Sequence, residues 1–337
     1  MITDSLKKVA AGQDLSYDEA YACMDEIFSG EVSEAVTAGY LTALHMKGET
    51  TDEITASAKG MRSHAEALPH DGLDVLEIVG TGGDCANSFN ISTTSGMVAA
   101  AAGVPIAKHG NRSVSSQCGA ADVLEVLGVN ITIAPEKMGE VLKGCNMSFM
   151  FAQVYHKALK YVAPDRKQLG IPTIFNILGP LTNPACAKMQ ILGVYKEELV
   201  DQMAPVLSGL GVTNGMVVYG QDCLDEISMS APTTVCEIRN GELNKYVIEP
   251  EDFGFEKCDK SELVGGDPAE NAAITKAILS GEEKGAKRKA VIINAAACIY
   301  VAGKADSLKE AAKIAADMID SGKALEVLNQ FVELSNN

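Results

Sequence analysis

A glycine-rich segment followed by a run of hydroxyl-bearing residues has the composition of an anion-binding site. Gly80-Thr-Gly-Gly-Asp84 ends a short apolar, strand-like run, and Asn90-Ile-Ser-Thr-Thr-Ser95 opens the next helical stretch. Glycines let backbone N–H groups approach a ligand closely, and a helix N-terminus adds partial positive charge. Because a bare carboxylate repels phosphate, we expect Asp84 to face a sugar hydroxyl or a metal-bound water. The alternative is a plain tight turn, since the spacing fits neither a dinucleotide fingerprint nor a Walker loop.

Cationic and acidic segments follow two later strand-like runs. Lys108-His-Gly-Asn-Arg-Ser-Val-Ser-Ser116 offers a point charge and a planar guanidinium, both suited to phosphate. The adjacent carboxylates of Asp225 and Glu226 repel each other unless a cation lies near, and they suit Mg²⁺ when phosphates complete its coordination. The alternatives are a solvated basic loop and an ordinary acidic loop. A lone histidine such as His109 is more often a packing residue than a base.

A fourth segment combines an arginine with a rigid, proline-rich loop. Arg166 could hold a substrate carboxylate in a two-pronged pair, and Gly-Pro and Asn-Pro steps rigidify Phe175–Pro184. The alternative is a surface arginine beside a structural turn. The sequence has no Gly-x-Ser-x-Gly elbow and its cysteines show no reactive setting, so it does not suggest covalent catalysis.

The elements that must position these residues change in character near residue 70. Residues 1–68 have the pattern of successive helices, with capping boxes at Ser16–Glu19 and Thr50–Glu53, and Pro69–Gly72 marks a boundary. Strands and helices then alternate: we expect strands at 74–79, 104–107, 191–194 and 216–219, and helices at 92–102, 120–127 and 197–209. This pattern predicts an α/β fold, with a small all-helical domain plus a larger α/β domain that has a central, largely parallel sheet.

Further local signals concern the second half of the chain. Asn240-Gly241 indicates a hairpin within 231–265, and Asp267 begins a helix. We expect Ser307 to cap the last long helix, and 290–293 to be either a strand or the start of a buried helix. Four prolines within 164–184 mark a linker-like stretch whose apolar residues predict that it is packed.

Composition and charge narrow the classes of partner. The 337 residues carry 28 Lys plus Arg against 45 Asp plus Glu, a formal charge of −17 that repels nucleic acid and anionic membranes. The longest apolar stretches are far too short to span a membrane. Nine scattered cysteines without a CxxC pair, and no apolar leader at the start, predict reduced thiols and a cytoplasmic protein.

Eight stretches, in this order, resemble the anthranilate phosphoribosyltransferase family. They are GTGGD (80–84), NIST (90–93), KHGNRSVSS (108–116), ADVLE (121–125), VAPDRKQLGI (162–171), IFNILGPLTNP (174–184), LDEIS (224–228) and GGDPAENAA (265–273). One such stretch is weak evidence, whereas eight in order across roughly residues 5–335 are highly specific.

The resemblance implies a reaction, a cofactor and an assembly. Members of this family join anthranilate to 5-phosphoribosyl 1-diphosphate, release diphosphate in tryptophan biosynthesis, require Mg²⁺ and pair as homodimers through their helical domains. The implied helical dimerisation domain is 1–70 with part of 165–190, and the implied phosphoribosyl-transfer domain, similar to nucleoside phosphorylases, is 71–164 and 191–337. Because an aromatic amine is neutral at pH 7, we hypothesise that attack needs no strong general base.

The resemblance also assigns roles to residues. The implied phosphoribosyl-diphosphate-binding residues are Gly80, Gly83, Asp84, Ser88, Asn90, Ile91, Ser92, Thr93, Lys108, His109, Gly110, Asn111, Arg112, Ser113, Val114, Ser115, Ser116 and Ala120. The implied metal-binding residues are Ser92, Asp225 and Glu226. The implied anthranilate-binding residues are Gly80, Asn111 and Arg166, and His109 and Gly179 are expected to line the path that anthranilate takes.

Five positions depart from the family pattern. Members commonly have Gly where Cys85 and Cys223 stand, Lys at Gln117, Ser at Ala120 and His at Tyr219. If position 223 requires a positive φ, its cysteine alters the loop before the metal-binding pair. We expect these changes to affect substrate affinities more than the reaction itself.

Two other functions remain open on the sequence alone. A pyrimidine-nucleoside phosphorylase would use phosphate as its nucleophile and bind a base, but KHGNRS and NILGPLTNP fit the anthranilate enzyme better. A non-catalytic relative that binds nucleic acid would have a basic surface and would lack the Asp225-Glu226 pair, which this chain retains.

Overall fold

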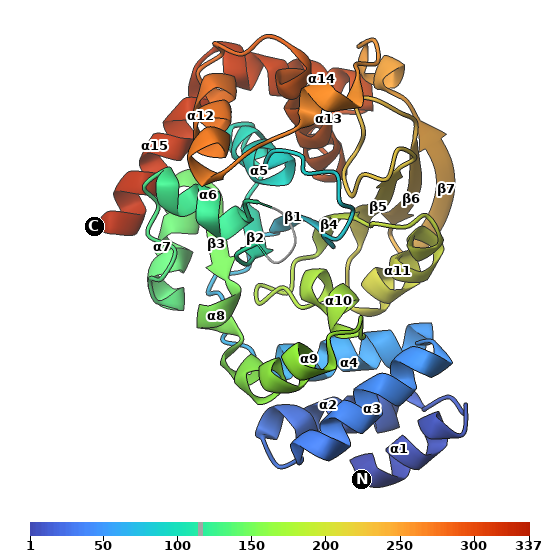
Figure 1. Cartoon of the computed structure of the whole chain (residues 1–337). Helices are drawn as coiled ribbons and strands as arrows, with labels where there is room; N and C mark the ends of the chain where they lie inside the picture. The colour runs from blue at the N-terminus through green and yellow to red at the C-terminus, as the bar shows by residue number, and fades with distance from the viewer. Residues whose placement is uncertain (114–116) are drawn as a thin grey trace.

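The helical part of the chain forms a bundle beside a larger α/β unit. The computed structural model describes residues 1–113 and 117–337. The bundle contains α1 (Ile2–Ala10), α2 (Tyr17–Ser29), α3 (Glu34–Lys47) and α4 (Thr51–Ser63), at the bottom of Figure 1. Both predicted capping boxes are confirmed: the side chains of Ser16 and Thr50 accept from the backbone N–H groups of Glu19 and Glu53, and these begin α2 and α4.

Within the described residues, one sheet of seven strands organises the larger unit. The strands are β1 (Leu76–Gly80), β2 (Ile106–Gly110), β3 (Met147–Phe151), β4 (Met189–Gly193), β5 (Asn214–Gly220), β6 (Thr233–Arg239) and β7 (Glu242–Ile248), in the order β3-β2-β1-β4-β5-β6-β7. The strands from β3 to β5 pair in parallel, and β6 and β7 add antiparallel pairs. The chain builds outward on one side of β1 and then crosses to β4 on the other, and a crevice at the carboxyl ends of such strands is where ligands bind.

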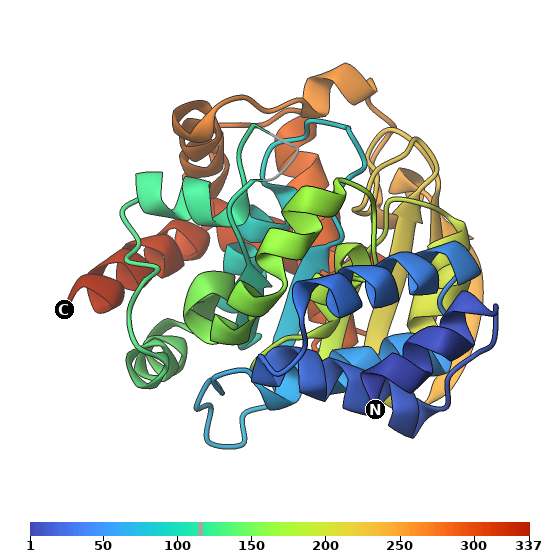
Figure 2. The same ribbon diagram turned by 60° about the horizontal axis from the view of Figure 1, so that its bottom comes forward.

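Helices cover the sheet on both faces (Figures 1 and 2). The longer helices of this unit are α5 (Ile91–Ala101), α6 (Ala120–Val126), α7 (Pro135–Cys145), α11 (Glu198–Gly209), α12 (Pro268–Leu279), α13 (Ala286–Val301), α14 (Leu308–Asp320) and α15 (Lys323–Asn336). Shorter helical segments are α8 (Ala152–Tyr155), η1 (Lys157–Tyr161), α9 (Ala163–Leu169), α10 (Phe175–Leu178), η2 (Gly179–Leu181), η3 (Pro250–Phe253) and η4 (Lys260–Leu263).

Two hydrophobic cores hold these layers together. On one face of the sheet, Ile78 of β1 and Ile191 of β4 belong to a cluster with Met97 of α5. On the other face, Leu192 of β4 belongs to a cluster with Ile54 of α4. The helical bundle therefore shares a core with one face of the sheet.

The proline-rich stretch packs against the bundle, as predicted. Its helices contact the bundle, α9 against α3 and α10 against α4. Arg62 of α4 is buried, and its Nε donates to the carbonyl of Leu181 at 2.8 Å while Nη1 donates to that of Leu210 at 3.2 Å. Residues 163–181 therefore pack against the helical bundle.

Most predicted elements are confirmed, and two predictions need correction. The predicted parallel strands and the Asn240-Gly241 hairpin are present, and Asp267 caps α12. Residues 290–293 lie inside the buried helix α13, so the strand alternative is wrong, and the predicted buried helix begins earlier, at Ala286. Ser307 caps α14 but not the last helix, because α15 follows it after a short turn. No helix among the described residues is long and apolar enough to cross a membrane.

Candidate active site

The turn after β5 folds over the carboxyl ends of β1 and β4. Gly80 ends β1, and a Cβ placed there would collide with the Asp225 carboxylate; one at Gly193 would collide with the Asp225 carbonyl. Glycine is therefore required at both strand ends so that the turn can approach the backbone this closely. This close packing brings the predicted metal-binding pair to the glycine-rich loop.

The glycine-rich loop and the acidic turn are joined by hydrogen bonds. The backbone N–H of Gly82 donates to Oδ2 of Asp225 at 2.7 Å. A second hydrogen bond joins the same two segments: Oδ2 of Asp84 accepts from the backbone N–H of Asp225 at 3.4 Å. Gly82 and Gly83 have φ of 70° and 81°, in the left-handed region that glycine adopts without strain. The loop thus forms one unit with Asp225.

A buried lysine lies between the start of α5 and the acidic turn. Lys108 is 2% exposed, and its Nζ donates to the carbonyl of Ile78 at 2.6 Å and to Oγ of Ser92 at 3.1 Å. The backbone N–H of Ser92 donates to Oε1 of Glu226 at 3.1 Å. Burial lowers the pKa of Lys108, and the nearby Glu226 opposes that effect. The three residues that the sequence assigned to phosphate and metal binding therefore meet at one place.

The carboxylates of Asp225 and Glu226 lack enough nearby positive charge to balance them. Burial, followed by repulsion from Asp84 and Glu226, raises the pKa of Asp225 well above its usual range. Burial also raises the pKa of Glu226 to about 7, against the attraction of Lys108. A cation placed between these side chains would relieve both effects. The described residues contain no group of three His, Cys, Asp or Glu side chains arranged as a metal site, whereas Mg²⁺ is commonly held by one or two carboxylates plus substrate phosphates.

The loop after β2 is held by α6. Arg112 donates to the carboxylates of Asp122, at 3.0 Å, and Glu125, and these bonds raise its pKa further. Asp122 also accepts from the backbone N–H groups of Ser113, at 3.0 Å, and Gly119, at 2.9 Å. The structure thus places the Arg112 guanidinium on α6 carboxylates. The predicted residues Val114, Ser115 and Ser116 lie outside the described residues.

Two histidines line the opposite side of β2. Nδ1 of His109 lies 3.2 Å from the carbonyl oxygen of Gly179, and since a carbonyl only accepts, this nitrogen carries the proton. The His109 and His156 rings pack with their centroids 4.9 Å apart. Burial, followed by repulsion from His156, lowers the pKa of His109 well below its usual range. His109 is therefore a neutral imidazole that joins β2 to η2.

Arg166 and Asn111 have different surroundings. Arg166 stacks over the Phe175 ring, with 5.2 Å from Cζ to the ring centroid, and burial lowers its pKa. Within the part of the chain that the structure describes, no carboxylate forms an ion pair with Arg166. Asn111 is exposed, and its Oδ1 accepts from the backbone N–H of Arg112 at 2.8 Å. The structure records no direct contact between Arg166 and Asn111.

Two of the five departures adopt the backbone conformation that glycine favours. Cys85 has φ of 56° and Cys223 has φ of 62°. Both thiols are exposed, and the Tyr219 hydroxyl donates to Sγ of Cys223 at 3.5 Å. Gln117 is exposed and lines a cavity of about 130 Å³ beside Asn87 and Ser88. The cysteines keep the loop geometry but do so in a strained backbone region.

The sequence analysis did not name two side chains that contact the predicted site residues. Asp122 joins the two ends of the segment 113–119, and Asn271 contacts Asn90 at the start of α5. Both lie in stretches that carry the family resemblance, ADVLE and GGDPAENAA. The spacing from Gly119 to Asp122 is that of a helix-capping pair, which was a usable signal for Asp122.

Comparison with known proteins agrees with this geometry. Residues 72–325 match the glycosyl transferase family a/b domain, and residues 3–65 match its helical bundle domain. Anthranilate phosphoribosyltransferases from Lachnoclostridium phytofermentans and Methanobrevibacter smithii are 62% and 60% identical, over 100% of this chain and 99% and 100% of theirs. The chain belongs to the anthranilate phosphoribosyltransferase family.

Solved structures from this family share the fold. The crystal structure of anthranilate phosphoribosyltransferase from Thermus thermophilus superposes with a TM-score of 0.94 at 43% identity, covering 99% of this chain and 100% of that one. The Saccharomyces cerevisiae enzyme in complex with PRPP and Mg superposes with a TM-score of 0.92 at 30% identity, covering 99% and 98%. The family resemblance and the fold class predicted from the sequence are confirmed, and the protein is an enzyme of the glycosyltransferase class.

Proposed function

We propose that this site transfers the phosphoribosyl group of 5-phosphoribosyl 1-diphosphate to the amine of anthranilate and releases diphosphate, a step of tryptophan biosynthesis. The observation that carries the proposal is the meeting of the glycine-rich loop, Lys108 and the Asp225-Glu226 pair at the carboxyl edge of the sheet. A glycine loop, a helix N-terminus and a lysine bind phosphate, and paired carboxylates bind a divalent cation. Membership of the family supplies the identity of the acceptor.

The donor-binding residues surround the ends of β1 and β2. We assign the diphosphate and ribose to Gly80, Gly83, Asp84, Ser88, Asn90–Thr93 and Lys108–Ser113, with Val114, Ser115, Ser116 and Ala120 retained as predictions. The backbone N–H groups at the start of α5 can donate to phosphate oxygens. Lys108 adds a positive charge that burial keeps from being screened by water.

We assign a Mg²⁺ ion to Asp225, Glu226 and the hydroxyl of Ser92. The residues fit such an ion, because the two carboxylates have raised pKa values and the Ser92 oxygen lies between Lys108 and Glu226. The Saccharomyces cerevisiae relative was solved with PRPP and Mg. When bound, Mg²⁺ neutralises the charge that grows on diphosphate as it leaves.

The acceptor side supplies orientation. We assign the anthranilate carboxylate to Arg166, whose planar guanidinium stacks on Phe175 and can form a two-pronged pair. We assign Asn111 and Gly80 to the place where amine and ribose meet. We assign His109 to the path that anthranilate takes. It bonds to the Gly179 carbonyl as a neutral imidazole, because burial lowers its pKa. An aromatic amine attacks with its free lone pair, and catalysis then rests on alignment and electrostatic stabilisation.

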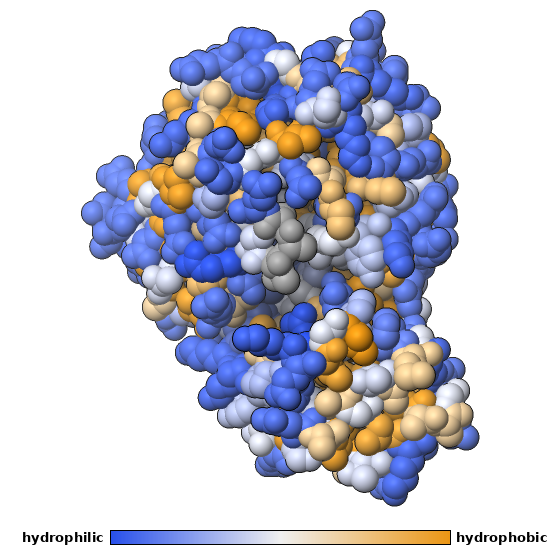
Figure 3. Space-filling view, viewed as in Figure 1, coloured by the Kyte–Doolittle hydropathy of each residue, from blue (hydrophilic) through white to orange (hydrophobic). Residues whose placement is uncertain are grey.

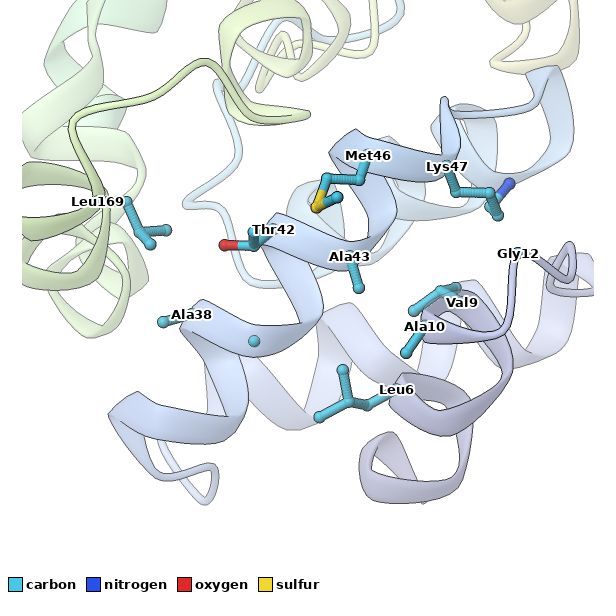
Figure 4. A pocket seen from close by; sticks show the side chains of 11 residues that line it. Leu6, Val9, Ala10, Gly12, Ala38, Thr42, Ala43, Met46, Lys47 and Leu169 are labelled. Carbon is cyan, nitrogen blue, oxygen red and sulfur yellow. The ribbon is translucent and has the colours of Figure 1, made fainter.

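We further propose that the enzyme is a cytoplasmic homodimer. The helical bundle, 1–70 with part of 165–190, would be the dimerisation domain, and 71–164 with 191–337 the transfer domain. An apolar groove of about 630 Å³ runs between α1 and α3 and is lined by Leu6, Val9, Ala43, Met46 and Leu169 (Figure 4). Hydrophobic side chains gather over the bundle on the face shown in Figure 3. None of the nine cysteines, all of which are described, forms a disulfide, as suits a reducing compartment.

The experiment that tests the activity follows the fluorescence of anthranilate. Purified protein with 5-phosphoribosyl 1-diphosphate and Mg²⁺ should consume the fluorescence, and a sample without metal should not. Equal loss in both samples would contradict the metal assignment. Folded protein that leaves anthranilate untouched, with fresh donor and metal present, would overturn the proposed activity.

A further inference from the structure

The stretch Gly265–Ala273 carries part of the family resemblance, yet none of the roles above involves it. In the fold, the residues that begin it run beside the donor loop. Ser88 and Val264 form an isolated antiparallel bridge, and the backbone N–H of Phe89 donates to the carbonyl of Leu263 at 3.2 Å. The backbone N–H of Gly265 donates to the carbonyl of Asn87 at 2.9 Å. Residues 263–265 therefore run antiparallel to the loop 87–89 and hold it by backbone hydrogen bonds.

The approach of the two segments leaves no room for a side chain at residue 265. A Cβ on Gly265 would lie 2.6 Å from Oδ1 of Asn271 and 2.7 Å from Cα of Phe89. Contacts this short are sterically forbidden, so glycine is needed for close approach rather than for a special φ. The absence of a side chain lets Asn271 reach across to the loop.

Helix α12 fixes the direction of Asn271. Asp267 caps this helix by accepting from the backbone N–H groups of Ala269 and Glu270, at 2.8 and 2.9 Å. Asn271 lies in the first turn and is only 1% exposed. Its Oδ1 accepts from the backbone N–H of Gly266 at 2.8 Å, and its Nδ2 donates to Oδ1 of Asn90 at 3.0 Å. Both ends of the Asn271 amide thus have a partner.

Asn90 in turn joins two parts of the donor site. It precedes α5, and its backbone carbonyl accepts from the N–H of Thr94 at 3.1 Å. Its Nδ2 donates to the carbonyl of Cys118 at 3.3 Å, near the end of the segment that begins at Lys108. With Oδ1 committed to Asn271, the Asn90 amide has one satisfied orientation, because a flip would place two donors face to face. Asn271 therefore holds the Asn90 amide in the orientation that bonds to residue 118.

We propose that Asn271 is a positioning residue for the phosphoribosyl donor, acting through Asn90. It acts through its bond to Asn90, which joins the start of α5 to residue 118. This inference rests on the proposed function of the site. It predicts that loss of the Asn271–Asn90 bond weakens donor binding and leaves the anthranilate contact at Arg166, on α9, unaffected.

The test compares two variants of Asn271 with a matched control. Asn271→Asp keeps an acceptor for Gly266 but replaces the donor that faces Asn90 with an oxygen, and Asn271→Ala removes both groups. The control is Thr275→Val, one turn along α12, which is fully buried and loses a 3.0 Å bond to Thr94 of the same helix α5. Steady-state kinetics with each substrate varied, together with thermal unfolding, gives KM, kcat and stability for every variant.

We expect both Asn271 variants to raise the KM for 5-phosphoribosyl 1-diphosphate by about tenfold or more, as the loss of a buried hydrogen bond implies. The KM for anthranilate should stay within about twofold of the parent enzyme, since Arg166 lies on α9, outside both of the segments that Asn90 joins. Thr275→Val should lower the melting temperature similarly while leaving both KM values unchanged. A donor KM that rises equally in Thr275→Val, or an anthranilate KM that rises as much as the donor KM, would overturn the inference.

A double-mutant cycle keeps the inference testable if Asn271→Ala folds poorly. In an Asn90→Ala background, Asn271→Asp should raise the donor KM by little more than Asn90→Ala does alone, because both changes remove one interaction. Full additivity of the two effects would contradict action through Asn90. Activity of the unsubstituted enzyme is measured alongside, so an inactive parent refutes the proposed function, whereas an active parent with insensitive variants refutes only the role of Asn271.

Discussion

Oδ2 of Asp225 accepts a hydrogen bond from the backbone N–H of Gly82, 2.7 Å away, and thereby fastens the acidic turn to the glycine-rich loop. The same carboxylate is repelled by Asp84 and Glu226. The hydrogen bond from Gly82 fixes the position of the Asp225 carboxylate. Repulsion from Asp84 and Glu226 makes its negative charge unfavourable unless a cation is bound. A carboxylate that destabilises the fold in this way is typical of a functional site.

Asp225→Asn should therefore separate metal dependence from stability. The amide keeps an oxygen for Gly82 but removes one negative charge, so the Mg²⁺ concentration for half-maximal activity should rise by about tenfold or more. Without metal, the variant should unfold at a higher temperature than the parent, because repulsion with Asp84 and Glu226 is reduced. The measurements are a Mg²⁺ titration of activity and a thermal melt in chelator.

A surface carboxylate serves as the control for Asp225→Asn. Asp201 forms an exposed ion pair with Lys245, at 2.8 Å, and Asp201→Asn should change neither the Mg²⁺ dependence nor the melt appreciably. An unchanged Mg²⁺ requirement in Asp225→Asn would remove that residue from the metal site.

Arg166→Met should raise the KM for anthranilate by about tenfold or more and leave the donor KM nearly unchanged, because a two-pronged pair with the substrate carboxylate is lost. Methionine retains packing against Phe175. Arg239 is a matched control, since its guanidinium also stacks on a ring, that of Tyr300, at the same 5.2 Å, but lies far from the site on β6. Arg239→Met should leave both KM values alone. Equal damage to both substrates in Arg166→Met would contradict the assignment of that residue to anthranilate.

Met46→Glu should convert the proposed dimer into monomers. Met46 is 82% exposed on α3 and lines the apolar groove, so a carboxylate there would be buried without a partner in a dimer. Sedimentation equilibrium gives the mass of each variant. Val247→Glu, on the exposed strand β7 at 53% exposure, is the control and should keep the mass of the parent. A parent that is monomeric at micromolar concentration, or a Met46→Glu variant that keeps its dimer mass, would rule out this face as the interface.

Cys223→Gly should be about 1 kcal/mol more stable than Cys223→Ala, since only glycine adopts a φ of 62° without a steric penalty. Both substitutions remove the contact between Sγ and the Tyr219 hydroxyl, so the difference isolates the backbone. Chemical denaturation gives the two free energies of unfolding. The same pair of substitutions at Cys258, where φ is not positive, should reverse the order, because glycine there adds only unfolded-state entropy. If the alanine variant were more stable than the glycine variant at residue 223 as well as at residue 258, the backbone at Cys223 would not be strained.

The sequence predicted the local features of the fold and site that depend on neighbouring residues. Capping boxes, the Asn240-Gly241 hairpin and the glycine-rich loop are set by chemistry within a few residues, and each is present. The pairing of Asp225 with residues 143 positions earlier depends on strand order, which no local pattern contains. The order of the motifs indicated that both segments belong to one family. The strand order of the sheet then explains why Gly82 and Asp225 lie side by side.

Features that depend on tertiary packing were missed or misplaced. Residues 290–293 form an apolar run that a strand and a buried helix share, and only burial of α13 on all sides decides between them. The sequence pattern predicts no element over Met147–Phe151, which is fully buried as β3 and therefore lacks alternation. The motif offers Arg112 as a free cation for phosphate, but its partners Asp122 and Glu125 lie on a helix whose orientation a sequence does not state.

Burial of His156 should lower the free energy of unfolding of the enzyme as the pH becomes acidic. Burial lowers the pKa of His156 from 6.5 to about 4, and the nearby Arg62 adds to this effect. The folded state thus binds fewer protons than the unfolded state between these values, so the contribution of a neutral His156 is complete above pH 6.5 and is lost as the pH falls toward 4. The shift corresponds to about 3 kcal/mol. Burial raises the pKa of Glu77 from 4.5 to about 8, so its contribution to stability is lost as the pH rises through this range, opposite in direction to that of His156.

Comparison with His156→Gln isolates the contribution of the histidine, because the variant retains Glu77 and Arg62. Denaturant unfolding from about pH 7 to pH 4 should show the free-energy difference between parent and variant shifting against the parent as the pH falls, since only the parent must bury a group that protonates when unfolded. A difference that stays constant over this range would show that His156 is protonated in the folded protein.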